Sequence, residues 1–247
     1  MTKIYEALVH ASEQRKESVE CRMPLSHPQS LLESPDKLNM EREMLELYQA
    51  VESLLLNKPK RIIQFIGSQL GEGTSTISRE FARVSATRVG KSVLLIDADL
   101  SSERKNRFSS STDTNCSCLE AMKSGRYMDE ALTHMGTSNF FTTFLSNNGR
   151  LNAEIFDSEL IDVFWDRIRE RFDLTIIDSP PLTATPDGLA IAPKADGIVL
   201  VVQAEKTRWT ITENVKERIT KAGGNILGIV FNKRRFYIPQ FIYNRLR

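Results

Sequence analysis

Residues 67–76, GSQLGEGTST, form the segment with the clearest capacity for chemistry. Its glycines allow backbone N–H groups to turn inward around a phosphate, and the amino end of a following helix would add a positive field. Walker A phosphate-binding loops end in Gly-Lys-Ser/Thr, whereas this one ends in Gly73-Thr74-Ser75. Ser75 supplies the hydroxyl that would ligate Mg²⁺, and Thr74 replaces the lysine. The alternative is a glycine-rich turn between a strand and a helix that binds no ligand.

Aspartates follow two later apolar runs. In VLLIDAD, Asp97 and Asp99 come after the run, and in LTIIDSPP, Asp178 does so. Ligands of open α/β sheets bind at the carboxyl ends of strands, and carboxylates placed there can hold Mg²⁺ directly or through water. Aspartate also simply ends strands and begins turns. Two such strands after a glycine-rich loop favour a nucleotide site.

The elements that must position these residues alternate between strands and helices. Short apolar runs predict buried strands, and the segments between them have helical periodicity. This alternation indicates an α/β fold with three α/β/α layers and a mostly parallel central sheet. The predicted strands are 61–66, 92–96, 174–177, 198–202 and 226–231, and the predicted helices are 75–89, 157–171 and 207–222.

The sequence before and after this alternation differs in composition. Residues 1–57 are predicted to be a helical extension with a proline-containing linker over 21–39 and a helix over 40–56. Residues 58–235 would form the α/β domain. Residues 236–247 form an apolar and basic tail that contains Tyr237 and Tyr243.

Composition excludes several classes of protein. Lys and Arg number 33 and Asp and Glu 32, so the net charge of +1 argues against a histone-like nucleic-acid binder. No apolar run approaches the ~18 residues of a transmembrane helix, and the first residues lack the pattern of a signal peptide. Cys21, Cys116 and Cys118 have no framework spacing and are expected to be free thiols. We therefore expect a cytoplasmic protein without a transmembrane segment.

The motifs GEG-T-ST, VLLIDAD, IIDSPP, ADGIVLVV and GIVFNKRR occur in that order. This order resembles the cytoplasmic domain of bacterial tyrosine kinases, which are P-loop NTPases of the MinD/ParA class. That family serves the synthesis and export of capsular and exopolysaccharides. The similarity runs from about Glu43 to the C-terminus, and the opening MTKIYEALVHA resembles the start of stand-alone members.

The resemblance implies a site for ATP or ADP with Mg²⁺. Asp97 and Asp99 correspond to the acidic motif that holds Mg²⁺ and activates the attacking tyrosine hydroxyl. Asp178 corresponds to the Walker B aspartate, and Asn232 to the residue that recognises adenine, although Asn232 also suits a strand-end turn. The residues corresponding to the Walker A loop are Gly71, Glu72, Gly73, Thr74, Ser75 and Thr76. The implied metal ligands are Ser75, Asp97, Asp99 and Asp178.

The resemblance also implies partners. They are an inner-membrane polysaccharide chain-length or co-polymerase protein, which would hold the chain peripherally at the membrane, and further copies of the chain. No nucleic acid is expected. The family's oligomer-forming Glu-x-x-Arg-x-x-Arg helix aligns with Glu43, Glu46 and Gln49, so both arginines are missing, which disfavours a ring formed by that route.

Departures from the family leave three functions open. Thr74 is neutral where the family has its phosphate-binding lysine, and Arg79 and Lys91 are candidate substitutes for that charge. Ser101 stands where the family usually has an arginine. The chain is accordingly a tyrosine kinase, a regulatory member that works by protein contact, or a partitioning-type ATPase. The tail tyrosines are either phosphorylation sites or part of a docking surface.

Overall fold

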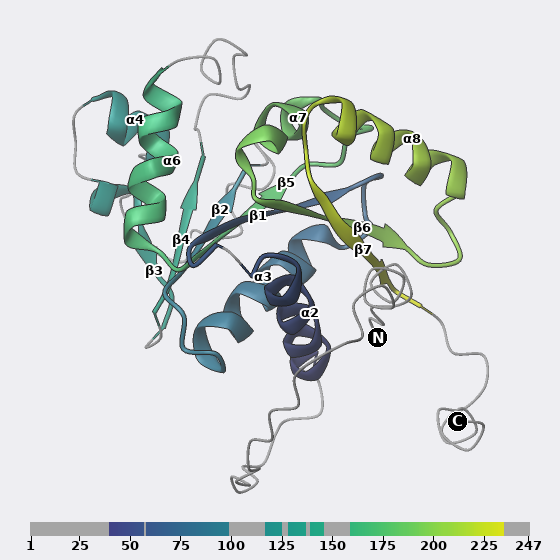
Figure 1. The fold of residues 1–247 in the computed structure, drawn as a ribbon, viewed down its shortest axis with the longest axis horizontal. Coiled ribbons are helices and arrows are strands. Elements are labelled where there is room, and N and C mark those ends of the chain that lie inside the picture. Colours follow the sequence, from purple (N-terminus) through teal and green to yellow (C-terminus); the bar gives the residue numbers. More distant parts are fainter. Residues whose placement is uncertain are drawn as a thin grey trace, which may run out of the picture.

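A computed structural model describes residues 40–56, 58–98, 117–124, 128–136, 139–145 and 159–234. Asp99, Ser101, Cys21, Cys116, Tyr237, Tyr243 and the segment 1–39 lie outside these residues. Within them, seven strands form one sheet in the order β3-β4-β2-β5-β1-β6-β7 (Figure 1). Only β3 runs antiparallel to its neighbour among these strands.

The strands are β1 (Arg61–Gly67), β2 (Val93–Asp97), β3 (Thr133–His134), β4 (Phe140–Phe144), β5 (Leu174–Ser179), β6 (Gly197–Gln203) and β7 (Ile226–Asn232). The α-helices are α2 (Glu41–Leu54), α3 (Thr74–Thr87), α4 (Cys118–Lys123), α6 (Glu159–Arg171), α7 (Asp187–Ile191) and α8 (Trp209–Lys221). Short 3-10 helices span Met128–Ala131 and Ala192–Lys194. Every strand and helix predicted above within the described residues is present, with ends displaced by at most two residues.

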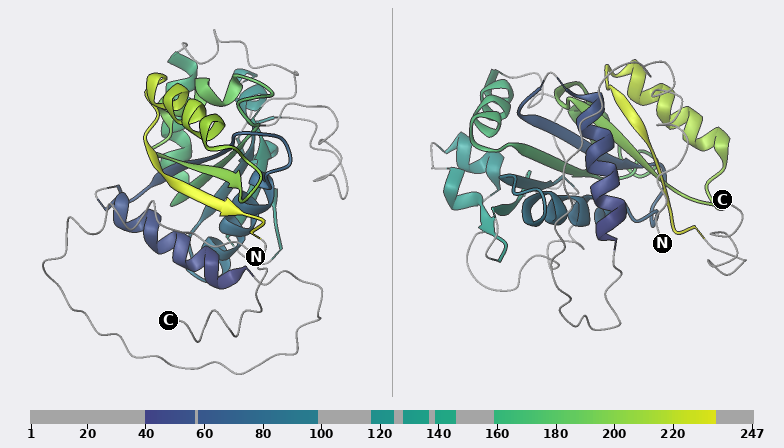
Figure 2. Two further views of the ribbon diagram at one scale, coloured as in Figure 1. Left: turned by 90° about the vertical axis from the view of Figure 1, so that its right-hand side faces the viewer. Right: turned by 60° about the horizontal axis from the view of Figure 1, so that its bottom comes forward.

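Helices cover both faces of the sheet, which confirms the three-layer architecture. One face packs on α2 and α3, and the other on α4, α6, α7 and α8 (Figures 1 and 2). The central strands are buried on both sides, and this explains why β2 and β6 are apolar over most of their length rather than alternating. In β1 the run is interrupted by the buried Gln64, whose Nε2 donates to Ser179 Oγ and the Gly188 carbonyl.

Helix α2 packs directly into the core below the sheet. Met44 and Leu47 are at most 2% exposed and share a cluster with Phe65 of β1 and Phe81 of α3. The Arg88 guanidinium, at the end of α3, pairs with the Glu41 carboxylate at the start of α2, with an Nε–Oε1 distance of 2.7 Å. Helix α2 is thus held against α3 both by apolar packing and by charge.

The sequence did not predict the strands β3 and β4, the helices α4 and α7, or the two 3-10 helices. Strand β4 contains two adjacent threonines, Thr142 and Thr143, in a buried position, so it lacks a simple apolar run. The Thr143 hydroxyl donates to the Ala131 carbonyl at 2.7 Å, which satisfies it inside the core. Helix α4 is short and begins with a capping box of Ser117 and Glu120.

Candidate nucleotide site at the carboxyl edge of the sheet

The glycine-rich loop connects β1 to α3, as predicted. Gly71 and Gly73 have φ angles of +82° and +91°, which are costly for residues that carry a Cβ. Gly73 is also crowded, because a Cβ there would lie 2.3 Å from Asn232 Nδ2. Helix α3 begins immediately after Gly73 and has no acidic residue in its first turn. Its amino end therefore directs a positive field toward the loop.

The Glu72 carboxylate is folded into the base of the loop. It is 2% exposed and accepts hydrogen bonds from the Ser68 and Gln69 backbone N–H groups at 2.6 and 2.8 Å. The Ser68 and Thr207 hydroxyls donate to its other oxygen at 2.7 and 2.6 Å. Glu72 therefore shapes the loop with its side chain, and only its backbone is available to face a phosphate. Sequence reasoning missed Thr207, which lies 135 residues away in the chain.

Asn232 ends β7 at the same edge of the sheet and is 8% exposed. Its side-chain Nδ2 donates to the Glu72 carbonyl at 2.8 Å, and its Oδ1 accepts from the Lys233 N–H at 2.8 Å. The structure thus brings Asn232 to the loop, and its assignment to adenine recognition stays a prediction. In the structure this amide has a structural task, because Asn232 fixes the loop backbone.

The loop is further supported by the segment after β5. The Thr183 hydroxyl donates to the Ser68 carbonyl at 2.8 Å, and the Leu182 N–H donates to the Gly67 carbonyl at 3.2 Å. This segment follows Asp178 directly in the sequence. The DSPPLT run therefore contains a carboxylate near the end of β5 and two residues that hydrogen-bond to the loop.

Asp97 and Asp178 lie side by side on neighbouring parallel strands. They are register partners at the carboxyl ends of β2 and β5 and are 6% and 5% exposed. In register, Asp178 also pairs with Phe65 of β1, and Phe65 packs in the cluster shared with α3. Residues in register on adjacent strands point to the same face, so both carboxylates share the face of the sheet that α3 covers.

Ser75 lies in the first turn of α3, on that same side of the sheet. Carboxylate and hydroxyl oxygens are the ligands Mg²⁺ prefers, together with waters and substrate phosphates. Among the described residues, no three His, Cys, Asp or Glu side chains cluster closely enough to hold an ion alone. Two carboxylates and a hydroxyl on the same side of the sheet as the glycine-rich loop have the chemistry of an ion site that a bound phosphate would complete.

The two candidate substitutes for the missing lysine differ in position. Lys91 stands just before β2 begins, at the opposite edge of the sheet from the loop, so its proposed role is wrong. Burial alone would raise the pKa of Glu52, but hydrogen bonds from Tyr48 and Arg61 and the nearby charges of Arg61 and Lys91 lower it. The charge of Lys91 therefore acts on Glu52 of α2. Arg79 remains a candidate, because it lies on α3 five residues after Thr74.

Thr74 turns its hydroxyl back toward the start of the loop. Its Oγ1 lies 2.7 Å from the position that a Cβ on Gly67 would take. The side chain is short and neutral, and it cannot reach across the loop as a lysine does. The charge at this position is absent.

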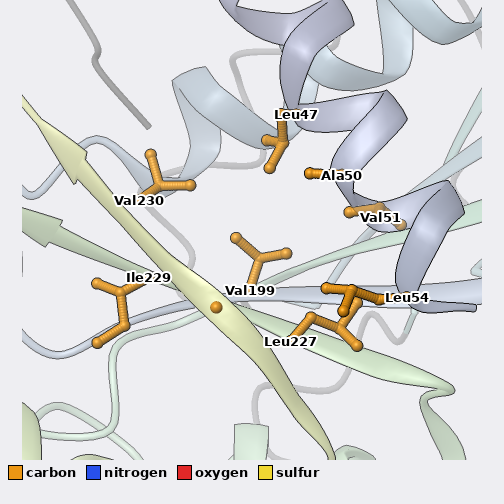
Figure 3. A pocket seen from close by; sticks show the side chains of 9 residues that line it. Leu47, Ala50, Val51, Leu54, Val199, Leu227, Ile229 and Val230 are labelled. Atoms are coloured by element: carbon orange, nitrogen blue, oxygen red, sulfur yellow. The ribbon is translucent and has the colours of Figure 1, made fainter. Parts of the chain in front are cut away.

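A separate apolar pocket lies between α2 and β7 (Figure 3). Its lining has no hydrogen-bonding side chain, so it does not suit a phosphate. The residues lining it are Leu47, Ala50, Val51, Leu54, Val199, Leu227, Gly228, Ile229 and Val230.

Comparison with known proteins agrees with this geometry. No family model matches the chain. The tyrosine-protein kinase CpsD of Streptococcus agalactiae is 25% identical over 199 residues, which are 80% of this chain and 86% of that protein. The chain is a homologue of bacterial tyrosine-protein kinases.

Solved structures support the same fold. The kinase domain of the Escherichia coli tyrosine kinase ETK superposes with a TM-score of 0.67 at 19% identity, covering 81% of this chain and 79% of that one. The septum site-determining protein MinD of Pyrococcus horikoshii, complexed with Mg-ADP, has a TM-score of 0.55 at 20% identity and covers 76% of this chain and 77% of its own. The fold is that of the MinD/ParA P-loop NTPases. In the described part of the chain, no helix has the length and apolar character to cross a membrane.

Proposed function

We propose that this homologue of bacterial tyrosine kinases binds ATP and ADP with Mg²⁺ at the carboxyl edge of its sheet. The observation that carries the proposal is the convergence of the glycine-rich loop with Asp97 and Asp178, on the face that α3 covers. Backbone N–H groups of the loop would hold the phosphates. Ser75, Asp97 and Asp178 would hold the ion, with Asp99 as a fourth ligand.

The activity that fits this site is transfer of a phosphoryl group to tyrosine. Mg²⁺-ATP supplies the transferable phosphate, and Asp97 or Asp99 would accept the proton of the attacking hydroxyl. Tyr237 and Tyr243 are the acceptors in the tail of the same chain or of another copy. By homology, the setting is capsule or exopolysaccharide synthesis, with an inner-membrane chain-length protein as partner and a peripheral location at that membrane.

A second candidate is a regulatory member that works by contact without phosphoryl transfer. Thr74 favours it, because the neutral side chain removes charge stabilisation that phosphoryl transfer uses. A partitioning-type ATPase is the third candidate, since MinD shares the fold. The greater similarity to a tyrosine kinase domain, with a TM-score of 0.67 against 0.55, favours the first two.

Calorimetric titration with Mg²⁺-ATP and Mg²⁺-ADP tests the shared part of the proposal. Asp178→Asn should weaken binding in the presence of Mg²⁺ and change it little when EDTA is present. Asp166→Asn is the matched control, because Asp166 is an exposed aspartate on α6. Absence of binding at millimolar nucleotide would overturn the proposal.

Mass spectrometry after incubation with Mg²⁺-ATP separates kinase from regulator. A kinase gives phosphotyrosine at Tyr237 or Tyr243, and Asp97→Asn abolishes it. Nucleotide binding without any phosphotyrosine, alone or with the membrane partner, favours the regulator.

A further inference from the structure

Lys233 reaches the glycine-rich loop from the end of β7, two strands away from β1. It follows β7, and its Nζ donates a hydrogen bond of 2.5 Å to the Gly71 carbonyl. Its Cε lies 3.7 Å from the position that a Cβ on Gly73 would take. The side chain therefore passes over Gly73 and ends at Gly71, 162 residues earlier in the chain.

Lys233 has an unusual backbone conformation, and the side chain of Asn232 holds its N–H group. Its φ angle is +57°, in the left-handed region that residues with a Cβ seldom adopt. Its N–H is bound by Asn232 Oδ1 at 2.8 Å, while Asn232 Nδ2 holds the Glu72 carbonyl. The last residue of β7 and the residue after it thus contact the carbonyls of two consecutive loop residues.

The ammonium group of Lys233 keeps its charge available. Among the residues that the structure describes, it forms no ion pair with a carboxylate, and its one contact is a neutral carbonyl. An ammonium has three N–H donors, so two remain for other acceptors. Lysine binds phosphate as a compact point charge and does not depend on a fixed planar geometry.

We propose that Lys233 supplies the phosphate-binding cation that Thr74 cannot, so that β7 rather than α3 carries this charge. The inference rests on the proposed nucleotide binding and names a residue of that same site. The chemistry that it recognises is the phosphate chain of a nucleoside di- or triphosphate. A purely structural role, in which Lys233 only fastens the loop, is the alternative that the experiment must separate.

The test compares Lys233→Gln, Lys233→Arg and the control Lys216→Gln, which removes an exposed charge on α8. Glutamine keeps an N–H donor but carries no charge and is one bond shorter than lysine. Affinities for Mg²⁺-ATP and for adenosine are measured by calorimetry, with circular dichroism to establish that each variant is folded. A hydrogen bond to a charged group corresponds to about 10- to 100-fold in affinity.

We expect Lys233→Gln to weaken ATP binding by about 10- to 100-fold and adenosine binding less than about twofold. Lys233→Arg and Lys216→Gln should retain ATP affinity. Introducing Thr74→Lys into Lys233→Gln should restore ATP binding, and should gain more there than in the unmodified protein, where two cations would repel.

Two results would overturn the inference while leaving the proposed function intact. One is ATP binding by Lys233→Gln equal to that of the unmodified protein. The other is an equal loss of affinity for ATP and for adenosine, which is expected if Lys233 only holds the loop in place. If the unmodified protein binds no nucleotide, the proposed function fails and this inference fails with it. Titration of the unmodified protein with Mg²⁺-ATP distinguishes that case from the two results above.

Discussion

Replacing Gly73 with alanine tests how tightly β7 closes on the loop, and Gly71 provides a matched control. Both glycines have left-handed φ angles, +91° and +82°. A Cβ at Gly71 would meet nothing within 4 Å, whereas one at Gly73 would lie 2.3 Å from Asn232 Nδ2. The pair therefore shares the backbone cost and differs only in the collision.

The magnitude follows from these contacts. A left-handed alanine costs about 1–2 kcal/mol of unfolding free energy at either position. At Gly73 the Asn232 side chain must also move, which breaks its 2.8 Å bond to the Glu72 carbonyl. That bond contributes about 0.5–1.5 kcal/mol net, and forcing an atom into a packed site costs about 1–3 kcal/mol. Gly73→Ala should thus be less stable than Gly71→Ala by about 1.5–4.5 kcal/mol.

Urea unfolding at neutral pH, followed by tryptophan fluorescence and circular dichroism, measures the difference. The dependence on urea must be equal in the two variants, so that the midpoints report stability. Truncating Asn232 to alanine should cost less in the Gly73→Ala background than in the unmodified protein, since the collision is then gone. Equal stability of the two glycine variants, within about 0.5 kcal/mol, would refute the close approach of Asn232.

Three other changes have expected outcomes. Burial alone would raise the pKa of Asp196, but hydrogen bonds from Arg169, Lys58 and the Ile62 N–H lower it. Asp196→Asn should therefore cost about 1.5–3 kcal/mol at pH 7, and urea midpoints should converge with those of the unmodified protein as the pH falls below the ordinary aspartate range toward the lowered pKa. Glu72→Ala leaves two backbone N–H groups of the loop without their acceptor, so amide exchange at residues 68 and 69 should accelerate and stability should fall by about 1–3 kcal/mol. Met44→Ala, at a fully buried position of α2, should cost about 2–5 kcal/mol in urea, whereas Leu56→Ala, at a side chain 70% exposed, should change stability by less than about 0.5 kcal/mol.

The sheet could be predicted because its central strands are buried on both faces. Burial on both sides forces continuous apolar runs, and such runs are visible in a single sequence. Strand β4 does not follow this rule, because it contains two polar residues, Thr142 and Thr143. They are buried through tertiary contacts, such as the hydrogen bond from the Thr143 hydroxyl to the Ala131 carbonyl. The short α4 and α7 lack enough turns to show a helical period.

The aspartate pair could be predicted for a related reason. Parallel strands bring all their carboxyl ends to one edge, so residues that follow separate runs must meet there. Register then places Asp97 beside Asp178 without any information from the side chains. Side chains alternate between the two faces along each strand, so the face that carries the two aspartates must be found from their neighbours. The packing of Phe65 against α3 identifies that face.

Contacts made by loops were beyond reach of the sequence. The Glu72 carboxylate could have faced a ligand or the loop, and its inward position depends on Thr207 and the Ser68 and Gln69 N–H groups. Lys91 was a candidate whose side chain could not be placed from the sequence. It precedes β2, so strand direction puts it at the edge of the sheet opposite the loop.

The loss of a lysine at position 74 is a local event, but the charge that a phosphate requires is a property of a place in space. In this sheet β7 lies two strands from β1, and its carboxyl end faces the same edge as the loop. A cation at that end is therefore close to the glycine-rich loop without sharing an element with it, and Lys233 meets this condition through its contact with Gly71. Whether Thr74 marks a site without function thus depends on the neighbouring strand ends rather than on the loop motif alone.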